Sequence, residues 1–503
     1  MEDLVREAYD GNRNFSNKTF RSGCYAPFTS LYFNSYGEVL ACCKNDTFVL
    51  GNIAHQRLNE IWNGDKLKLL RQALANYQFE KGCKVCEWEI MGGNYQGSFP
   101  SLFEVFPVQT IDPEWPAQIE FAGSNSCNFE CIMCSGELSS SIRSNREGLP
   151  PMPKVYSEQF FEDLRKFLPH LLQAKFLGGE PFFTQECFRI WDMMIEDGLT
   201  VPCHVTTNGS QFNAKVERVL EALPISLSIS VDGVTKETVE RIRVNSHYET
   251  LIDNLHRFRE YAKGRGTYFG LTYCLMQQNW HEFGDFLLFA EGLGCEVFVN
   301  TVIHPIHCSL YSLPPPQELS QIVDALEKQS NLIENSLRLN RHVWEENILK
   351  LRANTCDSQA DKFTEVVHIG HFGPKGDDLA AAWRLFDNGL YREALDAAAK
   401  TPASHPFYYQ SVALCGCIRH LLGDLEGAEL DLDRAVSISR RPAEALLYRA
   451  RLRIDQSRLT EGAEDALRAR TMIKHDHKLE AEVSEVMRLL SARRGHSSEA
   501  TEA

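Results

Sequence analysis

Apolar positions along the chain follow two periods, and these periods alternate between about residues 116 and 312. Short apolar runs in this region predict strands at 117–123, 174–180, 201–209, 225–233, 269–276 and 295–302. The stretches between the runs have the spacing of amphipathic helices. Strands that alternate with helices pair in parallel through crossover connections, so the pattern predicts an α/β fold, either a barrel or an open wound sheet.

Residues 21–95 have a different pattern, rich in cysteine, glycine and aromatic residues. The segment LYFNSYGEVLACC alternates around Tyr36 and Gly37 and predicts a β-hairpin. Helical periodicity follows over residues 58–77, and residues 92–116 have the composition of a loop. We therefore expect a small Cys-rich N-terminal domain at 21–95, ahead of the α/β domain at 116–312.

The last part of the chain is alanine-rich and helical, and it contains a repeat of 34 residues. Gly389, Gly423 and Ser457 occupy the same turn in successive units. Small residues recur where paired helices must approach closely, at Ala382, Gly416 and Ala450 and at Ala394, Ala428 and Gly462. The period resembles the tetratricopeptide repeat, with a generic helical bundle as the alternative. We expect an all-α repeat domain at 376–490, a helical connector at 313–375 and a disordered tail at 491–503.

Composition narrows the class of protein. The chain has 503 residues, too many for one hydrophobic core, and its net charge of −16 argues against a broad nucleic-acid or anionic-membrane surface. Its N-terminus lacks the apolar run of a signal peptide, and no stretch approaches the roughly 20 apolar residues of a membrane span. We expect a cytoplasmic protein that binds neither nucleic acid nor membrane. In that reducing compartment its 16 cysteines are better explained as metal or redox groups than as disulfides.

Three cysteines stand close together directly after the first predicted strand. Cys127, Cys131 and Cys134 have the spacing C-x3-C-x2-C. Structural zinc normally takes four ligands, and the nearest downstream histidine, His204, would have to be brought there by the fold. Three thiolates on a [4Fe–4S] cluster would instead leave one iron open to an external ligand.

This motif and four others in order resemble the radical S-adenosylmethionine (SAM) superfamily: GGEP at 178–181, TTNG at 206–209, SISVDG at 228–233 and RIR at 241–243. The resemblance implies a partial (β/α)6-type barrel, a [4Fe–4S] cluster on the three cysteines and bound SAM. It places GGEP at the methionine amino group, Met133 near the adenine and Arg243 at the methionine carboxylate. The SAM-binding residues that it implies are Met133, Gly178, Gly179, Glu180, Pro181, Thr207, Asn208, Ser230, Asp232 and Arg243.

A second cysteine set lies upstream of the first. Cys24, Cys42, Cys83 and Cys86 form the pattern C-x12-G-x4-C … C-x2-C, which resembles the twitch or SPASM extension of radical SAM enzymes. The resemblance implies one auxiliary [4Fe–4S] cluster, because the further cysteines of a full SPASM module are absent. A four-cysteine zinc knuckle is the alternative, and Cys43 is a spare candidate ligand. The extension usually follows the barrel, whereas here it precedes it.

The resemblance implies reductive cleavage of SAM to a 5′-deoxyadenosyl radical, with an electron donor such as flavodoxin or ferredoxin, and hydrogen abstraction from a substrate. The first hypothesis is a peptide or protein substrate, with the repeats holding the substrate or another protein partner. The second is a small biosynthetic intermediate, with the repeats recruiting a partner. A non-catalytic metal-binding scaffold is the third. The sequence identifies no catalytic acid, base or radical-quenching residue, and it does not predict the oligomeric state.

Overall fold

A computed structural model describes residues 3–45, 47–93, 95, 97–302, 305, 307–313, 318–355, 378–403, 405, 408–439, 442–472, 482–491 and 493. Most of the predicted tail at 491–503 and the second part of the predicted connector, from residue 356, lie outside these residues. Within the described part, no helix combines the length and the apolar character needed to cross a membrane.

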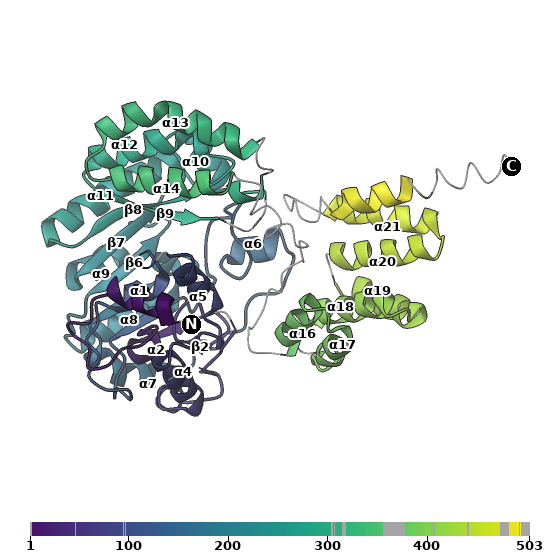
Figure 1. Cartoon of the computed structure of the whole chain (residues 1–503), viewed down its shortest axis with the longest axis horizontal. Coiled ribbons are helices and arrows are strands. Elements are labelled where there is room, and N and C mark those ends of the chain that lie inside the picture. The colour runs from purple at the N-terminus through teal and green to yellow at the C-terminus, as the bar shows by residue number, and fades with distance from the viewer. Residues whose placement is uncertain are drawn as a thin grey trace.

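One sheet of nine strands runs through the α/β region in the order β3-β2-β1-β4-β5-β6-β7-β8-β9 (Figure 1). Its parallel strands are β4 (Gln118–Phe121), β5 (Gln173–Phe176), β6 (Cys203–Thr207), β7 (Ile225–Ser230), β8 (Phe269–Leu275) and β9 (Glu296–Thr301). Each overlaps one of the six apolar runs, and only β5 begins one residue earlier than predicted, so those strand predictions are confirmed.

The helices between these strands pack on a single face of the sheet. They are α7 (Glu158–Phe167), α8 (Gln185–Glu196), α9 (Ala214–Ala222), α10 (Lys236–Ile242), α11 (Tyr248–Arg265) and α12 (Phe283–Leu293). Phe121 stacks on Phe160 of α7 with ring centroids 6.2 Å apart, and its register partner Phe176 lies 5.0 Å from Trp191 of α8. An open doubly wound sheet carries helices on both faces, so the arrangement is that of a partial (β/α)6 barrel.

The Cys-rich segment extends this same sheet. The strands β1 (Ser30–Phe33) and β2 (Glu38–Leu40) form the predicted hairpin, and β3 (Gly51–Asn52) pairs with β2. Because β1 also pairs in parallel with β4, the segment continues the barrel sheet beyond its first strand. The rings of Phe33 and Phe160 lie 5.5 Å apart, so the two regions share one hydrophobic core.

Helices flank the hairpin. They are α1 (Asp3–Gly11), α2 (Ala26–Thr29), α3 (Leu58–Trp62), α4 (Asp65–Ala75) and α5 (Lys84–Met91). The helical stretch at 58–77 is thus two helices, which meet at Asn63 and Gly64. The backbone of Gly64 is extended, with ψ of 159°, and a Cβ there would lie 2.8 Å from the Glu60 carbonyl oxygen, so glycine suits this break. The predicted loop at 92–116 contains a short 3-10 helix, Phe99–Phe103.

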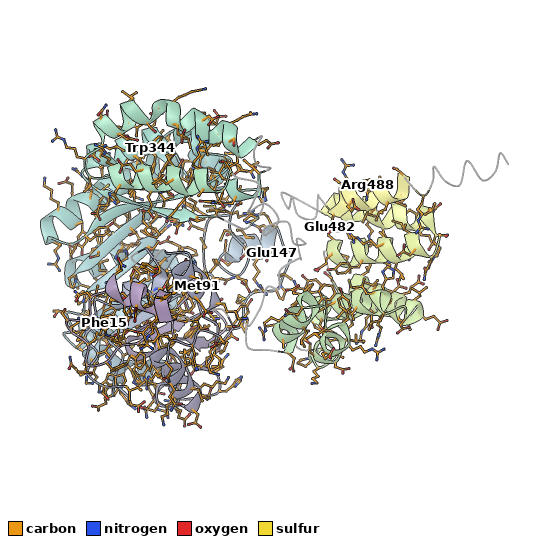
Figure 2. All side chains as sticks on the ribbon, viewed as in Figure 1. Phe15, Met91, Glu147, Trp344, Glu482 and Arg488 are labelled. Carbon is orange, nitrogen blue, oxygen red and sulfur yellow. The ribbon has the colours of Figure 1, made fainter. Side chains whose placement is uncertain are left out.

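The described half of the predicted connector packs against the barrel. It forms α13 (Glu318–Ser336) and α14 (Arg341–Ala353), which lie beside α12 (Figure 1). The ring of Trp344, labelled in Figure 2, stacks on Phe283 of α12 with centroids 5.5 Å apart. Residues 318–355 are therefore an additional helical layer over the barrel.

The C-terminal helices form three successive pairs. They are α16 (Asp378–Asp387), α17 (Tyr391–Ala398), α18 (Tyr408–Leu421), α19 (Leu425–Ile438), α20 (Ala443–Asp455) and α21 (Leu459–Met472). The turn residues Gly389, Gly423 and Ser457 all have left-handed backbones, with φ of 73°, 84° and 64°. A Cβ at Gly416 would lie 2.6 Å from Leu432 of the paired helix, so small residues do mark close helix contacts. The tetratricopeptide assignment itself stays a prediction.

This helical group shares a small core with the α/β region. Tyr36, in the turn of the hairpin, is buried among residues of α16, α17 and α18, and Leu149 and Met152 pack against the same cluster. The Tyr36 hydroxyl donates to Glu137 Oε1 at 2.9 Å, three residues beyond Cys134. Figure 2 shows Glu147, in the same segment, on the side of the barrel that faces the C-terminal helices.

Candidate active site

The cysteine loop after β4 is held by the glycines that follow β5. Gly178 has φ of 108°, in the left-handed region, and a Cβ at Gly179 would lie 2.3 Å from the Ser126 carbonyl oxygen. The backbone N–H of Gly179 donates to Ser124 O at 3.0 Å, and that of Glu180 donates to Ser126 O at 2.8 Å. These bonds fix the chain directly before Cys127, and glycine is required where the two backbones touch.

Glu180 joins two of the predicted motifs. Its carboxylate is fully buried and accepts hydrogen bonds from Phe182 N at 3.0 Å, Thr207 Oγ1 at 2.7 Å and Asn208 N at 2.7 Å. Burial raises the Glu180 pKa, and these three donors act in the opposite direction. The side chain of Asn208 continues toward the cysteine loop, with Nδ2 at 3.9 Å from Cys127 Sγ. Pro181, the last residue of GGEP, begins the short 3-10 helix Pro181–Phe183. The GGEP and TTNG segments therefore lie together beside Cys127.

Asp232 and Arg243 form a buried ion pair on the other side of the loop. Their side chains approach within 2.7 Å, Asp232 also accepts from Cys274 N at 2.7 Å, and Arg243 Nη1 lies 4.0 Å from Cys131 Sγ. Burial acts to lower the Arg243 pKa, but the charges of Asp232 and Cys131 outweigh it and raise the pKa. The guanidinium is thus engaged with Asp232 in this structure, and its assignment to the SAM carboxylate stays a prediction.

Two further predicted residues lie near this pair. The Ser230 hydroxyl accepts a hydrogen bond from Thr272 Oγ1 at 2.9 Å, which joins the end of β7 to the middle of β8. Met133 packs on a small apolar cluster whose buried members are Ile242, Met276, Val302 and Cys308. The predicted residues from the cysteine loop and the ends of β5, β6 and β7 therefore come together at one edge of the sheet.

The three thiols of the loop suit an iron–sulfur cluster. Burial raises the pKa of Cys127 to about 12 and also raises the pKa values of Cys131 and Cys134, so the thiolate forms need cationic partners. Among the described residues, no group of three or more His, Cys, Asp or Glu side chains is placed to hold a single metal ion. In a [4Fe–4S] cluster each thiolate binds a different iron, so its ligands stand farther apart than those around one zinc. Three thiols from one loop, whose raised pKa values a bound cation would offset, are the donor type that such a cluster takes.

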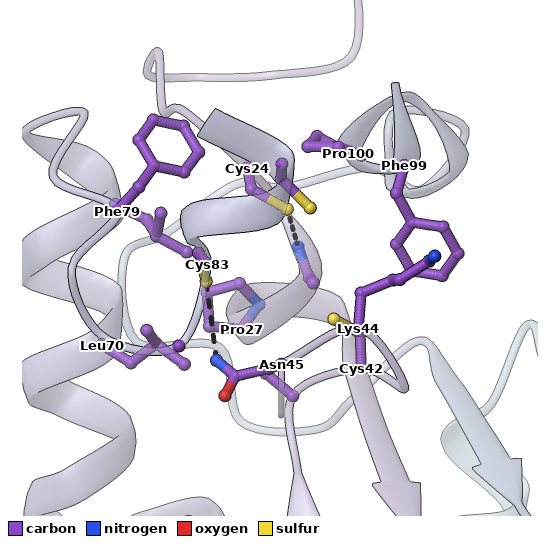
Figure 3. A pocket seen from close by; sticks show the side chains of 15 residues that line it. Cys24, Pro27, Cys42, Lys44, Asn45, Leu70, Phe79, Cys83, Phe99 and Pro100 are labelled. Carbon is purple, nitrogen blue, oxygen red and sulfur yellow. Dashed lines mark hydrogen bonds between the residues drawn. The ribbon is translucent and has the colours of Figure 1, made fainter. Parts of the chain in front are cut away.

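The second cysteine set lines one pocket. Cys24, Cys42, Cys83 and Cys86 converge there from α2, the end of the hairpin and α5 (Figure 3). The Ala26 backbone N–H donates to Cys24 Sγ at 3.4 Å. Cys43 does not line the pocket. Its thiol is instead hydrogen-bonded to Glu120 of β4. Burial raises the Cys43 pKa to about 12, and the negative charge of Glu120 adds to this effect. The geometry thus favours Cys42 as the ligand, a choice that the adjacent cysteines left open in the sequence.

The face of the sheet opposite the helices carries polar side chains, of which the sequence analysis named only His204, as a candidate zinc ligand. Glu120, Lys175 and His204 occupy one row across β4, β5 and β6. His204 Nε2 is 2.9 Å from Ser228 Oγ, and burial, with the Lys175 charge, lowers the His204 pKa to about 4, which keeps the ring neutral. Within the described residues, the Lys175 ammonium has no ion-pair partner. In the sequence, this row is indicated by polar residues at alternate positions of the strand segments QIEF, QAKF and CHVTT, because alternate side chains of a strand point to the same face.

Comparisons with known families identify both regions. The Radical SAM superfamily model matches residues 122–290, and the model of the iron–sulfur cluster-binding SPASM domain matches residues 24–87. The chain thus contains a region that matches the Radical SAM superfamily, and a region that matches the SPASM domain precedes it. The two domains imply SAM, a SAM-binding [4Fe–4S] cluster and auxiliary iron–sulfur.

Solved structures give distant matches. SuiB of Streptococcus suis bound to S-adenosylmethionine matches with a TM-score of 0.33 and 13% identity, over 53% of this chain and 64% of that chain. The enzyme anSMEcpe with bound AdoMet matches with a TM-score of 0.29 and 16% identity, over 44% and 62%. This chain thus spans less than two-thirds of the length of these structures. No curated protein sequence matches it.

Proposed function

We propose that this enzyme modifies a peptide or protein by hydrogen abstraction. When bound, the SAM-carrying cluster supplies the electron that converts SAM to methionine and a 5′-deoxyadenosyl radical. The observation that carries the proposal is the polar row of Glu120, Lys175 and His204, whose strands adjoin segments of both thiol sets. Lys175 lies three residues before Gly178, while Glu120 bonds to Cys43, the neighbour of Cys42. A substrate on this face would reach both centres.

We propose roles for the chain's own residues accordingly. Cys127, Cys131 and Cys134 hold the SAM-binding cluster, and Cys24, Cys42, Cys83 and Cys86 hold the auxiliary one. GGEP, Asn208 and Met133 border the SAM site, while Glu180, Asp232 and Arg243 fix the strand ends around it. A flavodoxin- or ferredoxin-type donor would deliver the electron, and the C-terminal helices would bind part of the substrate or a protein partner.

Replacing Lys175 with methionine is expected to weaken substrate turnover. The change removes the cation of the polar row, and a lost charge-assisted hydrogen bond costs about 1.5–3 kcal/mol, or roughly tenfold or more. The measurement is the ratio of substrate-dependent to substrate-independent 5′-deoxyadenosine formation, with Lys175→Arg retaining the charge. The exposed Lys215→Met is the matched control. Equal ratios in all three variants would contradict a substrate role for Lys175.

Removing residues 376–503 tests whether the substrate is a peptide. Candidate peptides are those encoded beside this gene, and product formation is followed by mass spectrometry. We expect turnover of the peptide to fall at least about tenfold, because the loss of a binding contribution of about 1.4 kcal/mol weakens binding by that factor. Because Tyr36 packs on these helices, iron content and melting temperature must be checked in the shortened protein. Undiminished turnover of a peptide would mean that the repeats do not hold the substrate, whereas no product from any candidate peptide with the full-length protein would favour a small-molecule substrate, with the repeats recruiting a partner.

A further inference from the structure

A buried asparagine stands at the wall of the auxiliary pocket. Asn45 is 1% exposed, and its Nδ2 donates to Lys81 O at 3.0 Å and to Cys83 Sγ at 3.5 Å. Its Oδ1 accepts from Phe48 N at 3.0 Å. Figure 3 shows the amide directed at the sulfur of Cys83. Both ends of the amide are therefore fixed, and the donor end faces a proposed cluster ligand.

The backbone around Asn45 is shaped to bring it this close. Gly82 has φ of 74°, and a Cβ at that position would lie 2.3 Å from Asn45 Oδ1. Any other residue at 82 would push the amide away from Cys83. Asn45 also lies three residues after Cys42, so its side chain ties the loop of Cys42 to the segment that carries Cys83 and Cys86.

We propose that Asn45 is a positioning residue that donates a hydrogen bond to the cluster-bound Cys83 thiolate and thereby raises the reduction potential of the auxiliary cluster. Reduction adds negative charge, part of which resides on the sulfurs. An N–H donor at a sulfur stabilises that charge, and hydrogen bonds to the sulfurs are among the factors that set cluster potentials. The inference rests on the auxiliary cluster of the proposed function and on no particular substrate.

The test is a potentiometric titration followed by electron paramagnetic resonance. The full-length parent carries Cys127→Ala, Cys131→Ala and Cys134→Ala, so that only the auxiliary cluster gives a signal. Asn45→Leu removes both hydrogen-bonding ends at similar volume, whereas Asn45→Asp keeps the acceptor for Phe48 N, loses the donor and adds a carboxylate charge that shifts the potential in the same direction. We expect both variants to lower the equilibrium constant for reduction about tenfold, which for a one-electron couple is a shift of about 59 mV to more negative potential. Asn63→Leu, at an exposed site in the same domain, should leave the potential unchanged.

The direction of the shift separates this role from a purely structural one. A loosened loop would admit water, which stabilises the more highly charged reduced cluster and moves the potential in the positive direction. A positive shift, an unchanged potential at full iron content, or loss of iron from both variants would each overturn the role of Asn45. A parent with no iron–sulfur signal would overturn the auxiliary cluster together with it.

Discussion

Cys131→Ala is expected to abolish 5′-deoxyadenosine formation in protein reconstituted without oxygen. Cys131 is 9% exposed and lies beside Arg243, and alanine removes one of the three thiols of the loop. With three ligands from the chain, loss of one leaves two, too few to hold the cluster. The measurement is deoxyadenosine by chromatography after addition of SAM and a strong reductant, which should fall to the protein-free background.

A buried cysteine outside both sets provides the control. Cys203 of β6 is 1% exposed, and its thiol lies 3.9 Å from the sulfur of Met194, on the helix-covered side of the sheet. Cys203→Ala removes a comparable buried thiol and should retain deoxyadenosine formation. Iron content should fall by about half in Cys131→Ala, because the auxiliary set is untouched. Deoxyadenosine at the level of the unmodified enzyme in Cys131→Ala would disprove the assignment of this loop.

Features with a local period or spacing could be predicted from the sequence. The six strands were located because each is a short apolar run, and in β7 one whole face, Ile225, Leu227 and Ile229, is buried. The two cysteine sets were located because their spacings resemble those of iron–sulfur cluster-binding families. The repeat turns were located because three positions 34 residues apart share a left-handed backbone, which favours small residues.

Features that depend on distant pairing could not be predicted. The sequence gives no local sign that β1 pairs in parallel with β4, because parallel partners are joined through long connections. The row of Glu120, Lys175 and His204 exists only once register places three strands side by side. The burial of Tyr36 against the C-terminal helices likewise needs residues more than 300 positions away.

Arg243→Met is expected to destabilise the fold strongly. Asp232 is fully buried and Arg243 is its salt-bridge partner at 2.7 Å, so methionine would leave a buried carboxylate without its counter-charge. Breaking a buried pair from one side costs about 3–5 kcal/mol. For a core of this size that corresponds to a melting temperature lower by roughly 10 °C. Differential scanning calorimetry of cluster-free protein measures the change without a contribution from iron binding.

The double variant Asp232→Asn with Arg243→Met separates a lost ion pair from a lost side chain. Asparagine can still accept the hydrogen bond from Cys274 N, and neither residue is charged, so much of the stability should return. Arg257→Met breaks a pair of the same length, 2.7 Å, whose side chains are about half exposed, and exposed pairs contribute only about 0–1 kcal/mol. If Arg243→Met lowered the free energy of unfolding no more than Arg257→Met does, the Asp232–Arg243 pair would not be the interaction that holds the ends of β7 and β8 around Cys131. If Arg243→Met loses much stability and the double variant regains it, the buried charge pair, rather than the volume of the arginine, fixes this side of the cysteine loop.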